Sequence, residues 1–167
     1  MKHTVYLSLG SNLGDRKANL KAAAAALAPI VGVLRASRIY QTAPWGYLDQ
    51  PDFLNQVLEC ETELAPLELL AHLKRIEKTL GRQPGVRYGP RLIDLDILFY
   101  DQLVVDLPEL TIPHPRAAER AFVLVPLADL APGLVHPVLM KTAAELLAAL
   151  DAGGVTRWPA GTEDKTC

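Results

Sequence analysis

The sequence predicts an α+β fold in which two helices cover one face of a sheet. Three observations support this prediction. Stretches with the apolar pattern of strands alternate with two helical stretches. Each helical stretch starts at a residue suited to a helix N-terminus, Asp15 for the first and Pro66 for the second. Residues 91–100 (RLIDLDILFY) are mostly apolar around two acids, which is typical of a buried central strand.

The first part of the chain alternates strand, helix and strand. Residues 4–10 (TVYLSLG) have the pattern of a strand. The helix expected from Asp15 to about Ala28 places the Asp15 carboxylate at the positive end of the helix dipole. Pro29 closes this helix, and residues 33–40 are predicted to form the second strand.

A long connection, residues 41–52, precedes a third strand at 53–62. Two prolines and a glycine exclude regular structure there, and its aromatic residues would be unusual in a loop without a function. Phe53 and Asn55 lie on the same face of the third strand. Because a buried amide needs hydrogen-bond partners, Asn55 either binds a ligand or bonds the backbone of a neighbouring loop.

The second helix runs from Pro66 to Gly81, and a loop at 82–90 with three helix breakers follows, which we expect to be mobile. The buried face of this helix is an apolar stripe of Leu69, Leu73, Ile76 and Leu80. After the strand with the two acids comes a short hairpin-like segment, 102–105. The whole order is the βαββαβ arrangement of a ferredoxin-like sandwich.

The last part of the chain predicts an additional C-terminal helical extension. Residues 110–116 are extended, 116–120 have room for one helical turn, and 122–130 form a buried run broken at Pro126. Thr142 and Glu145 form a capping box for a last helix. We expect a single domain over residues 1–152 and a flexible tail over 153–167.

Length and composition limit the classes of function. With 167 residues, 22% of them charged, and a formal net charge of −2, the chain is typical of one globular domain and does not favour general binding of nucleic acid. No apolar run approaches the ~20 residues of a membrane span, and no signal peptide is visible, so we expect a cytoplasmic protein. Cys60 and Cys167 form no disulfide framework, and Cys60 is expected to be a small buried residue.

Asp94 and Asp96 are the central chemical feature of the sequence. On a strand they project from the same side, with Cα atoms about 6.5–7 Å apart, while the opposite face carries apolar residues, Ile93, Leu95, Ile97 and Phe99. Two adjacent carboxylates on an apolar strand repel each other unless a cation lies between them, and Mg²⁺ is the usual one. The alternative is a strand at the sheet edge with both acids in water.

Arginines accompany the two acids. The segment between Lys78 and Lys141 contains no lysine but five arginines: Arg82, Arg87, Arg91, Arg116 and Arg120. Arginine binds phosphate oxygens through two parallel hydrogen bonds and keeps its charge when desolvated. Carboxylates for a metal beside arginines for phosphates indicate phosphoryl transfer, and no Walker-type phosphate loop is present.

Four stretches together resemble the hydroxymethyl-dihydropterin pyrophosphokinase family: Gly10–Asp15 (GSNLGD), Gly89–Asp96 (GPRLIDLD), Ile112–Pro115 (IPHP) and Glu119–Phe122 (ERAF). The resemblance covers about residues 4–150. It implies the ferredoxin-like fold, and transfer of pyrophosphate from ATP to the hydroxymethyl group of a dihydropterin, with AMP as the other product of this step in folate biosynthesis. It also implies two Mg²⁺ ions and small-molecule substrates, and we expect a monomer.

The resemblance further implies a role for individual residues. Asp94 and Asp96 would hold the metal ions and, with Arg82 and Arg91, form the catalytic set. The ATP-binding residues would be Lys74, Glu77, Arg82, Tyr88, Arg91, Ile97, Leu110, Thr111, His114 and Arg120. The pterin-binding residues would be Thr42, Ala43, Trp45, Phe53, Asn55, Asp94 and Phe122, with the pterin stacked between the two phenylalanine rings.

The chain departs from the pattern of some family members at Lys74, Pro84 and Glu109, which concern the nucleotide contacts. Two other classes remain as alternatives. A nucleotidyltransferase also uses Asp-x-Asp and a Gly-Ser turn, but Gly10-Ser11 lies more than eighty residues before Asp94. A non-catalytic ferredoxin-like binding module would have no use for the acids and arginines.

Overall fold

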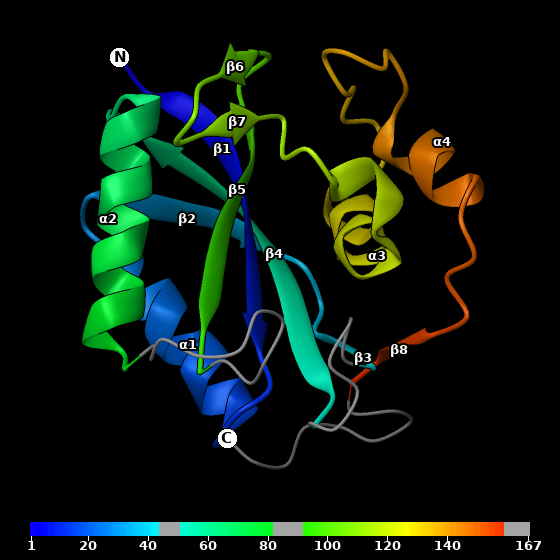
Figure 1. The fold of residues 1–167 in the computed structure, drawn as a ribbon, viewed down its shortest axis with the longest axis horizontal. Coiled ribbons are helices and arrows are strands. Elements are labelled where there is room, and N and C mark those ends of the chain that lie inside the picture. The colour runs from blue at the N-terminus through cyan, green and yellow to red at the C-terminus, as the bar shows by residue number, and fades with distance from the viewer. Residues whose placement is uncertain (44–50, 82–91, 159–167) are drawn as a thin grey trace.

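The computed structural model describes residues 1–43, 51–81 and 92–158. In these ranges the chain forms an α+β fold with an antiparallel sheet (Figure 1). The strands are β1 (His3–Ser11), β2 (Val31–Ala36), β3 (Tyr40–Thr42), β4 (Phe53–Thr62), β5 (Asp94–Tyr100), β6 (Val105–Asp106), β7 (Thr111–Ile112) and β8 (Val155–Arg157). The helices are α1 (Arg16–Leu27), α2 (Pro66–Thr79), α3 (Ala121–Leu130) and α4 (Ala143–Ala148), with a 3₁₀ turn at Ala117–Glu119.

The main sheet has the order β5-β1-β4-β3-β8, with β2 also paired to β4. Helices α1 and α2 lie on one side of this sheet, and α3 and α4 lie on the other (Figure 1). Each side buries its own apolar cluster. Leu9 and Leu95 belong to the cluster beneath α1 and α2, and Val57 and Phe99 belong to the cluster beneath α3 and α4. The sheet is therefore the middle layer of the molecule, covered by helices on both faces.

The two predicted helices begin where their sequence signals lie. Asp15 is the N-cap of α1, and its carboxylate accepts the N–H of Ala18 at 3.1 Å. Pro66 occupies the first turn of α2, and the Glu68 carboxylate accepts the N–H of Ala65 at 2.8 Å. The predicted stripe is buried at Leu69, Leu73 and Ile76, whereas Leu80, the C-cap residue after α2, is half-buried. Cys60 is also buried, and this burial raises the pKa of its thiol to about 12.

The second predicted strand, 33–40, is wrong in its bounds, because two shorter strands replace it. Ser37 lies between β2 and β3, and its hydroxyl accepts the N–H of Val57 at 3.0 Å and donates to the Arg38 carbonyl at 2.7 Å. A side-chain oxygen therefore takes the place of a backbone partner, and the ladder is interrupted.

The C-terminal part differs from the sequence predictions in two places. Pro126 does not break the run 122–130, because α3 continues through it, and only the bond that its missing N–H would make is lost. The tail expected over 153–167 is structured in its first residues, since β8 pairs with β3 through Thr42↔Val155 and the Trp158 N–H donates to the Ile39 carbonyl at 2.9 Å. The capping box of Thr142 and Glu145 does start α4, as predicted.

Candidate active site

Asp94 and Asp96 lie on one face of β5, opposite Gly10 and Ser8 of β1, and both are half-buried. The same-side prediction is confirmed, and the intervening Leu95 is buried beneath α1 and α2. In the described part of the chain β5 pairs with β1 alone, so the prediction of a central strand is wrong and the acids are at a sheet edge.

Phe99 does not share the face of Ile93, Leu95 and Ile97, in contrast to the prediction. The register with β1 shifts between Tyr6 and Leu7, so that Leu98 is an extra residue on β5. A bulge of this kind reverses the alternation of side chains after it. Phe99 therefore packs in the cluster beneath α3 and α4.

One row of paired residues runs across the sheet through the candidate site. Asp94 pairs with Gly10, Gly10 pairs with Asn55, and Asn55 pairs with Tyr40. Directly paired residues project to the same face, and neighbouring strands are about 4.8 Å apart. The backbones of Asp94 and Asn55 are consequently roughly 10 Å apart on one face, with only a glycine between them.

Gly10 leaves space for the groups beside it. A Cβ at this position would lie 3.2 Å from Oδ1 of Asn55 and 3.6 Å from Cδ1 of Phe53. Asn55 itself is 5% exposed, and its Nδ2 donates to Oγ1 of Thr42 at 3.4 Å. The Thr42 hydroxyl in turn donates to the Ala43 carbonyl at 3.3 Å. Four residues of the predicted pterin set, Thr42, Ala43, Phe53 and Asn55, are thus neighbours.

Phe122 is at the start of α3, on the side of the sheet that carries Asn55 and Asp94. Its ring is half-buried against the cluster beneath α3 and α4, and the Arg120 guanidinium carbon is 5.5 Å from the ring centroid. This distance is within the range of a cation–π contact. Arg120, a predicted ATP-binding residue, therefore contacts Phe122, a predicted pterin-binding residue.

His114 lies near enough to Asp96 for the charge of this acid to act on its ring. Its backbone N–H donates to the Leu98 carbonyl at 3.0 Å, and its Nδ1 accepts the N–H of Arg116 at 3.2 Å. Burial lowers the pKa of His114, and the charges of Arg120 and Arg116 lower it further, whereas Asp96 opposes this shift. A ring whose Nδ1 accepts a hydrogen bond carries its proton on Nε2, which is then available as a donor.

Glu77 of α2 hydrogen-bonds the backbone of the strand that carries the two acids. Its Oε2 accepts the N–H of Leu95 at 2.8 Å, and its Oε1 is 3.3 Å from Nζ of Lys74. Glu77 is 2% exposed. The family resemblance implies that Glu77 binds ATP. In the structure its carboxylate instead accepts the backbone N–H of Leu95, the residue between Asp94 and Asp96. An acid in a buried helical stripe, four residues after Leu73, was the signal available for this contact.

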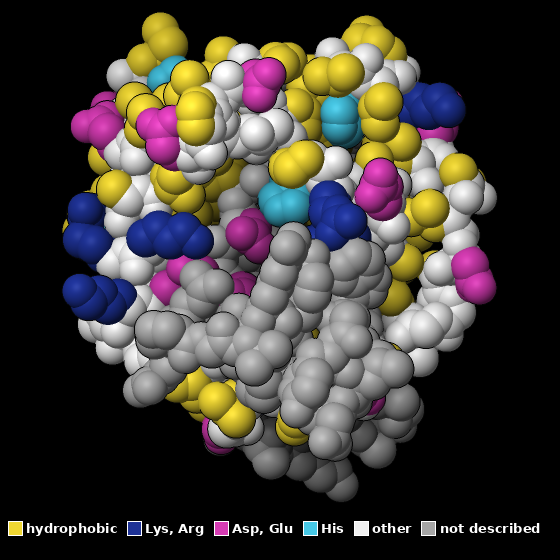
Figure 2. Space-filling view, in the orientation of Figure 1, with side chains coloured by type: hydrophobic (Ala, Val, Ile, Leu, Met, Phe, Trp, Pro, Cys, Tyr) yellow, Lys and Arg dark blue, Asp and Glu magenta, His cyan; other side chains and the backbone are white. Residues whose placement is uncertain are grey.

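Of the remaining predicted nucleotide residues that the structure describes, one is on the surface and two are in the core. Thr111 is exposed on β7, and Leu110 is buried. Ile97 is only 4% exposed and belongs to the cluster beneath α1 and α2. Four predicted residues lie outside the described ranges: Trp45, Arg82, Tyr88 and Arg91. Figure 2 shows histidine, acidic and basic side chains gathered near the centre of this face of the molecule.

The donor set at Asp94 and Asp96 fits Mg²⁺. Within residues 1–43, 51–81 and 92–158 no group of three or more His, Cys, Asp or Glu side chains is placed to hold a metal ion. Mg²⁺ does not require such a group, because it is usually bound by one or two carboxylates together with water and substrate phosphates. Two carboxylates on one face, with basic residues near them, provide the protein part of such a site.

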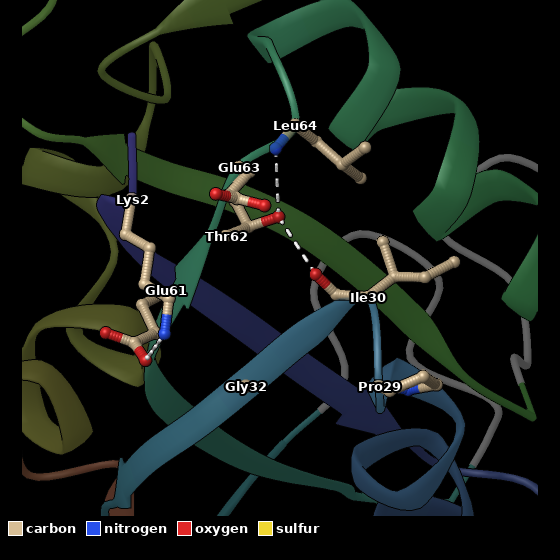
Figure 3. Close-up of a pocket in the computed structure, with 8 residues that line it drawn as sticks. All are labelled: Lys2, Pro29, Ile30, Gly32, Glu61, Thr62, Glu63 and Leu64. Atoms are coloured by element: carbon tan, nitrogen blue, oxygen red, sulfur yellow. Dashed lines mark hydrogen bonds and ion pairs between the residues drawn. The ribbon is translucent and has the colours of Figure 1, made fainter.

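A cavity of about 320 Å³ lies at the other end of the sheet, near Lys2, Thr62 and Glu61 (Figure 3). Its polar groups bond one another. Nζ of Lys2 donates to Glu61 at 3.0 Å, and the Thr62 hydroxyl donates to the Ile30 carbonyl at 3.1 Å and accepts the Leu64 N–H at 3.2 Å. None of the residues that line it belongs to the predicted site.

In the part of the chain that the structure covers, every helix is too short or too polar to cross a membrane.

Comparison with known proteins identifies the family. The sequence profile of 7,8-dihydro-6-hydroxymethylpterin-pyrophosphokinase (HPPK) matches residues 6–132. A 2-amino-4-hydroxy-6-hydroxymethyldihydropteridine pyrophosphokinase from Methylorubrum extorquens is 47% identical over 154 residues, which cover 91% of this chain and 96% of that protein. The protein of the same name from Bacillus subtilis is 47% identical over 132 residues, covering 78% of this chain and 79% of the relative.

Some relatives are much longer. The mitochondrial folate synthesis bifunctional protein of Pisum sativum is 51% identical over 127 residues, which are 75% of this chain but 25% of the pea protein. A crystal structure of Plasmodium falciparum HPPK-DHPS with pterin and p-hydroxybenzoate has a TM-score of 0.74 at 17% identity, covering 94% of this chain and 45% of that one. This structural likeness concerns the fold. The chain therefore belongs to the 7,8-dihydro-6-hydroxymethylpterin-pyrophosphokinase family, whose members carry out pyrophosphoryl transfer to a hydroxymethyl-dihydropterin in folate biosynthesis.

Proposed function

We propose that this chain transfers pyrophosphate from ATP to the hydroxymethyl group of 6-hydroxymethyl-7,8-dihydropterin, giving AMP and the pterin diphosphate. The observation that carries the proposal is the row from Asp94 through Gly10 to Asn55. It puts an acid suited to a metal-bound phosphate and an amide suited to a pterin edge on one sheet face. The intervening residue is a glycine, and a side chain there would crowd Asn55 and Phe53.

Asp94 and Asp96 would hold two Mg²⁺ ions at the site of the ATP phosphates. Bound there, Mg²⁺ neutralises phosphate charge and polarises the phosphoryl oxygens. Arg82, Arg91 and Arg120 would bind phosphate oxygens, and the Nε2–H of His114 would donate to one of them. Lys74, Tyr88, Leu110 and Thr111 would contact the rest of the nucleotide. Glu77 and Ile97 would act on that site through the strand itself, since both side chains are buried.

The pterin would stack between Phe53 and Phe122, since aromatic pairs gain energy beyond the area they bury. The amide of Asn55 would bond the polar edge of the pterin, with its Nδ2 oriented by Thr42. Ala43 and Trp45 would complete this pocket. Because Gly10 has no side chain, the hydroxymethyl group would approach the phosphates held at Asp94 without a steric barrier at this position.

The reaction requires few covalent changes. The hydroxymethyl oxygen attacks the β-phosphorus of ATP, the bond between that phosphorus and the oxygen bridging to the α-phosphate breaks, and AMP leaves with the bonding electrons. The hydroxyl proton is released. The role of the protein is to align the two substrates and to surround the developing charge with fixed donors.

We further propose the finer features expected from the sequence. The order β5-β1-β4 followed by β3 and β2, with α1 and α2 on one face, supports a ferredoxin-like βαββαβ core in which β2 and β3 together are the second strand. Helices α3 and α4 would then be the C-terminal extension. A single domain, a monomer and a cytoplasmic location remain predictions of the sequence.

Product analysis tests the proposal. The purified protein is incubated with ATP and Mg²⁺, with and without 6-hydroxymethyl-7,8-dihydropterin, and the nucleotides are separated by chromatography. We expect AMP, and a pterin carrying two phosphates, only when pterin is present. ADP as the nucleotide product, or AMP released equally without pterin, would contradict the proposal.

A further inference from the structure

Three side chains converge on the two residues that precede Phe53. Nδ2 of Asn12 donates to the Pro51 carbonyl at 3.0 Å, and a terminal guanidinium nitrogen of Arg16 donates to the Asp52 carbonyl at 2.9 Å. Nε2 of Gln41 donates to the Asp52 carboxylate at 3.0 Å. Both backbone carbonyls before β4 are therefore held by side chains from outside the connection.

These contacts begin where the backbone ladder ends. The pairing of β1 with β4 stops at Ser11↔Leu54, so Phe53 has its ladder partner, Thr42, on β3. Asn12 is the residue directly after β1, and Arg16 is the first residue of α1. The β1–α1 turn thus continues to hold the start of β4 through side chains after its backbone bonds have ended.

The turn that presents these donors is itself fixed. Nδ2 of Asn19 donates to the Leu13 carbonyl at 2.7 Å and to the Ser11 hydroxyl at 3.1 Å. Asn12 is 1% exposed. Burying an amide is unfavourable unless its hydrogen bonds are made, and a buried donor that bonds a carbonyl holds that carbonyl in one place.

We propose that Arg16 and Asn12 are positioning residues for the pterin, acting through Pro51 and Asp52 on the ring of Phe53. This inference rests on the proposed function, in which Phe53 forms one wall of the pterin pocket. A binding wall requires placement to within about 0.5 Å, and Phe53 is the first residue of its strand, where the ladder holds it on one side. The hydrogen bonds from Asn12 and Arg16 to the Pro51 and Asp52 carbonyls hold Phe53 from the other side.

The test compares Arg16→Ala with Lys21→Ala, which removes an exposed cation from the same helix. Titration calorimetry measures the binding of 6-hydroxymethylpterin, the stable oxidised form of the substrate, in the presence of Mg²⁺ and a non-hydrolysable ATP analogue. The binding of the ATP analogue alone is measured in parallel. For Arg16→Ala we expect the pterin Kd to rise about tenfold, as for the loss of one hydrogen bond with a charged donor.

Further readouts separate positioning from general stability. The ATP-analogue Kd of Arg16→Ala should stay within about twofold of the Lys21→Ala value, because Arg16 is not among the predicted ATP-binding residues. The tenfold change expected for the pterin Kd corresponds to ~1.4 kcal/mol. Arg16→Lys, which restores a cationic N–H donor, should recover part of the pterin affinity. Gln41→Ala, which leaves both carbonyl contacts in place, should weaken pterin binding less than Arg16→Ala does.

The outcomes are distinct. Equal weakening of pterin and ATP-analogue binding, or unchanged pterin binding in Arg16→Ala, would overturn the positioning role. If Arg16→Ala does not fold, Asn12→Asp, which removes the donor to the Pro51 carbonyl, decides the question by the same ratio of the two affinities. Absence of pterin binding by the unmodified protein would instead refute the proposed function.

Discussion

The Glu77 carboxylate accepts the backbone N–H of Leu95, the residue between Asp94 and Asp96, with an O···N distance of 2.8 Å. In the described part of the sheet β5 is an edge strand, so this N–H has no ladder partner. A buried carboxylate from α2 thus takes the role that a neighbouring strand would have. The backbone that carries both candidate metal ligands is fixed by this contact.

Glu77→Ala should therefore reduce both stability and turnover. The Leu95 N–H would be left buried without its acceptor, which costs about 1–3 kcal/mol, and the acids would lose their fixed spacing. Glu77→Gln keeps an acceptor oxygen and should retain most of the stability. Urea unfolding monitored by circular dichroism gives the free energies, with the exposed Glu63→Ala as control. A Glu77→Ala protein as stable as the control would show that the contact is dispensable.

Asp96→Asn should lower turnover by several orders of magnitude while the protein remains folded. The substitution keeps the shape of the side chain but removes the charge needed for Mg²⁺ beside the phosphates. AMP formation is measured across a range of Mg²⁺ concentrations, and thermal unfolding confirms the fold. Asp106→Asn, at an exposed position of β6, is the matched control. Mg²⁺-dependent turnover close to normal in Asp96→Asn would refute the metal assignment.

Phe53→Ala and Asn55→Ala should each weaken pterin binding and leave ATP binding almost unchanged. Removal of the ring loses stacking worth about 0.5–1.5 kcal/mol beyond the buried area, and removal of the amide leaves the polar pterin edge without its partner. Calorimetric titration with pterin and with an ATP analogue measures the two affinities separately. Equal loss of both would indicate damage to the fold and not to a pocket.

His136 should make the free energy of unfolding depend on pH. Its Nδ1 accepts the N–H groups of Val138 and Leu139 at 3.2 and 3.0 Å, and burial lowers the pKa of the ring below its ordinary value of 6.5. The unfolded chain therefore takes up this proton first as the pH falls. The contribution of His136 is present above pH 6.5 and is lost as the pH falls through the folded-state pKa.

Replacement of His136 by Asn isolates this effect. The Asn side chain can accept the same backbone N–H groups but does not titrate in this range. We expect His136→Asn to lose less stability than the unmodified protein between about pH 7 and pH 5, measured by urea unfolding at each pH. Because His114 is present in both proteins, its own titration cancels in the comparison. Parallel pH profiles for the two proteins would contradict the prediction.

The sequence by itself determined the features that depend on neighbouring residues. The helix starts at Asp15 and Pro66, the capping box at Thr142 and the shared face of Asp94 and Asp96 follow from local periodicity and local hydrogen bonds. The residues around the acids also indicated the family, which the comparisons confirmed. The roles of individual site residues remain predictions, because they depend on ligands.

Only the tertiary structure decided which segments meet. The bulge that moves Phe99 to the other face, the hydroxyl of Ser37 that interrupts the ladder and the position of β5 at the sheet edge are results of pairing between distant strands. The same is true of the contact between Glu77 and Leu95, and of the side chains that hold Pro51 and Asp52. Local periodicity indicates from which face of its own strand a side chain projects. It carries no information on the register of the next strand, which is set by the packing of the whole core.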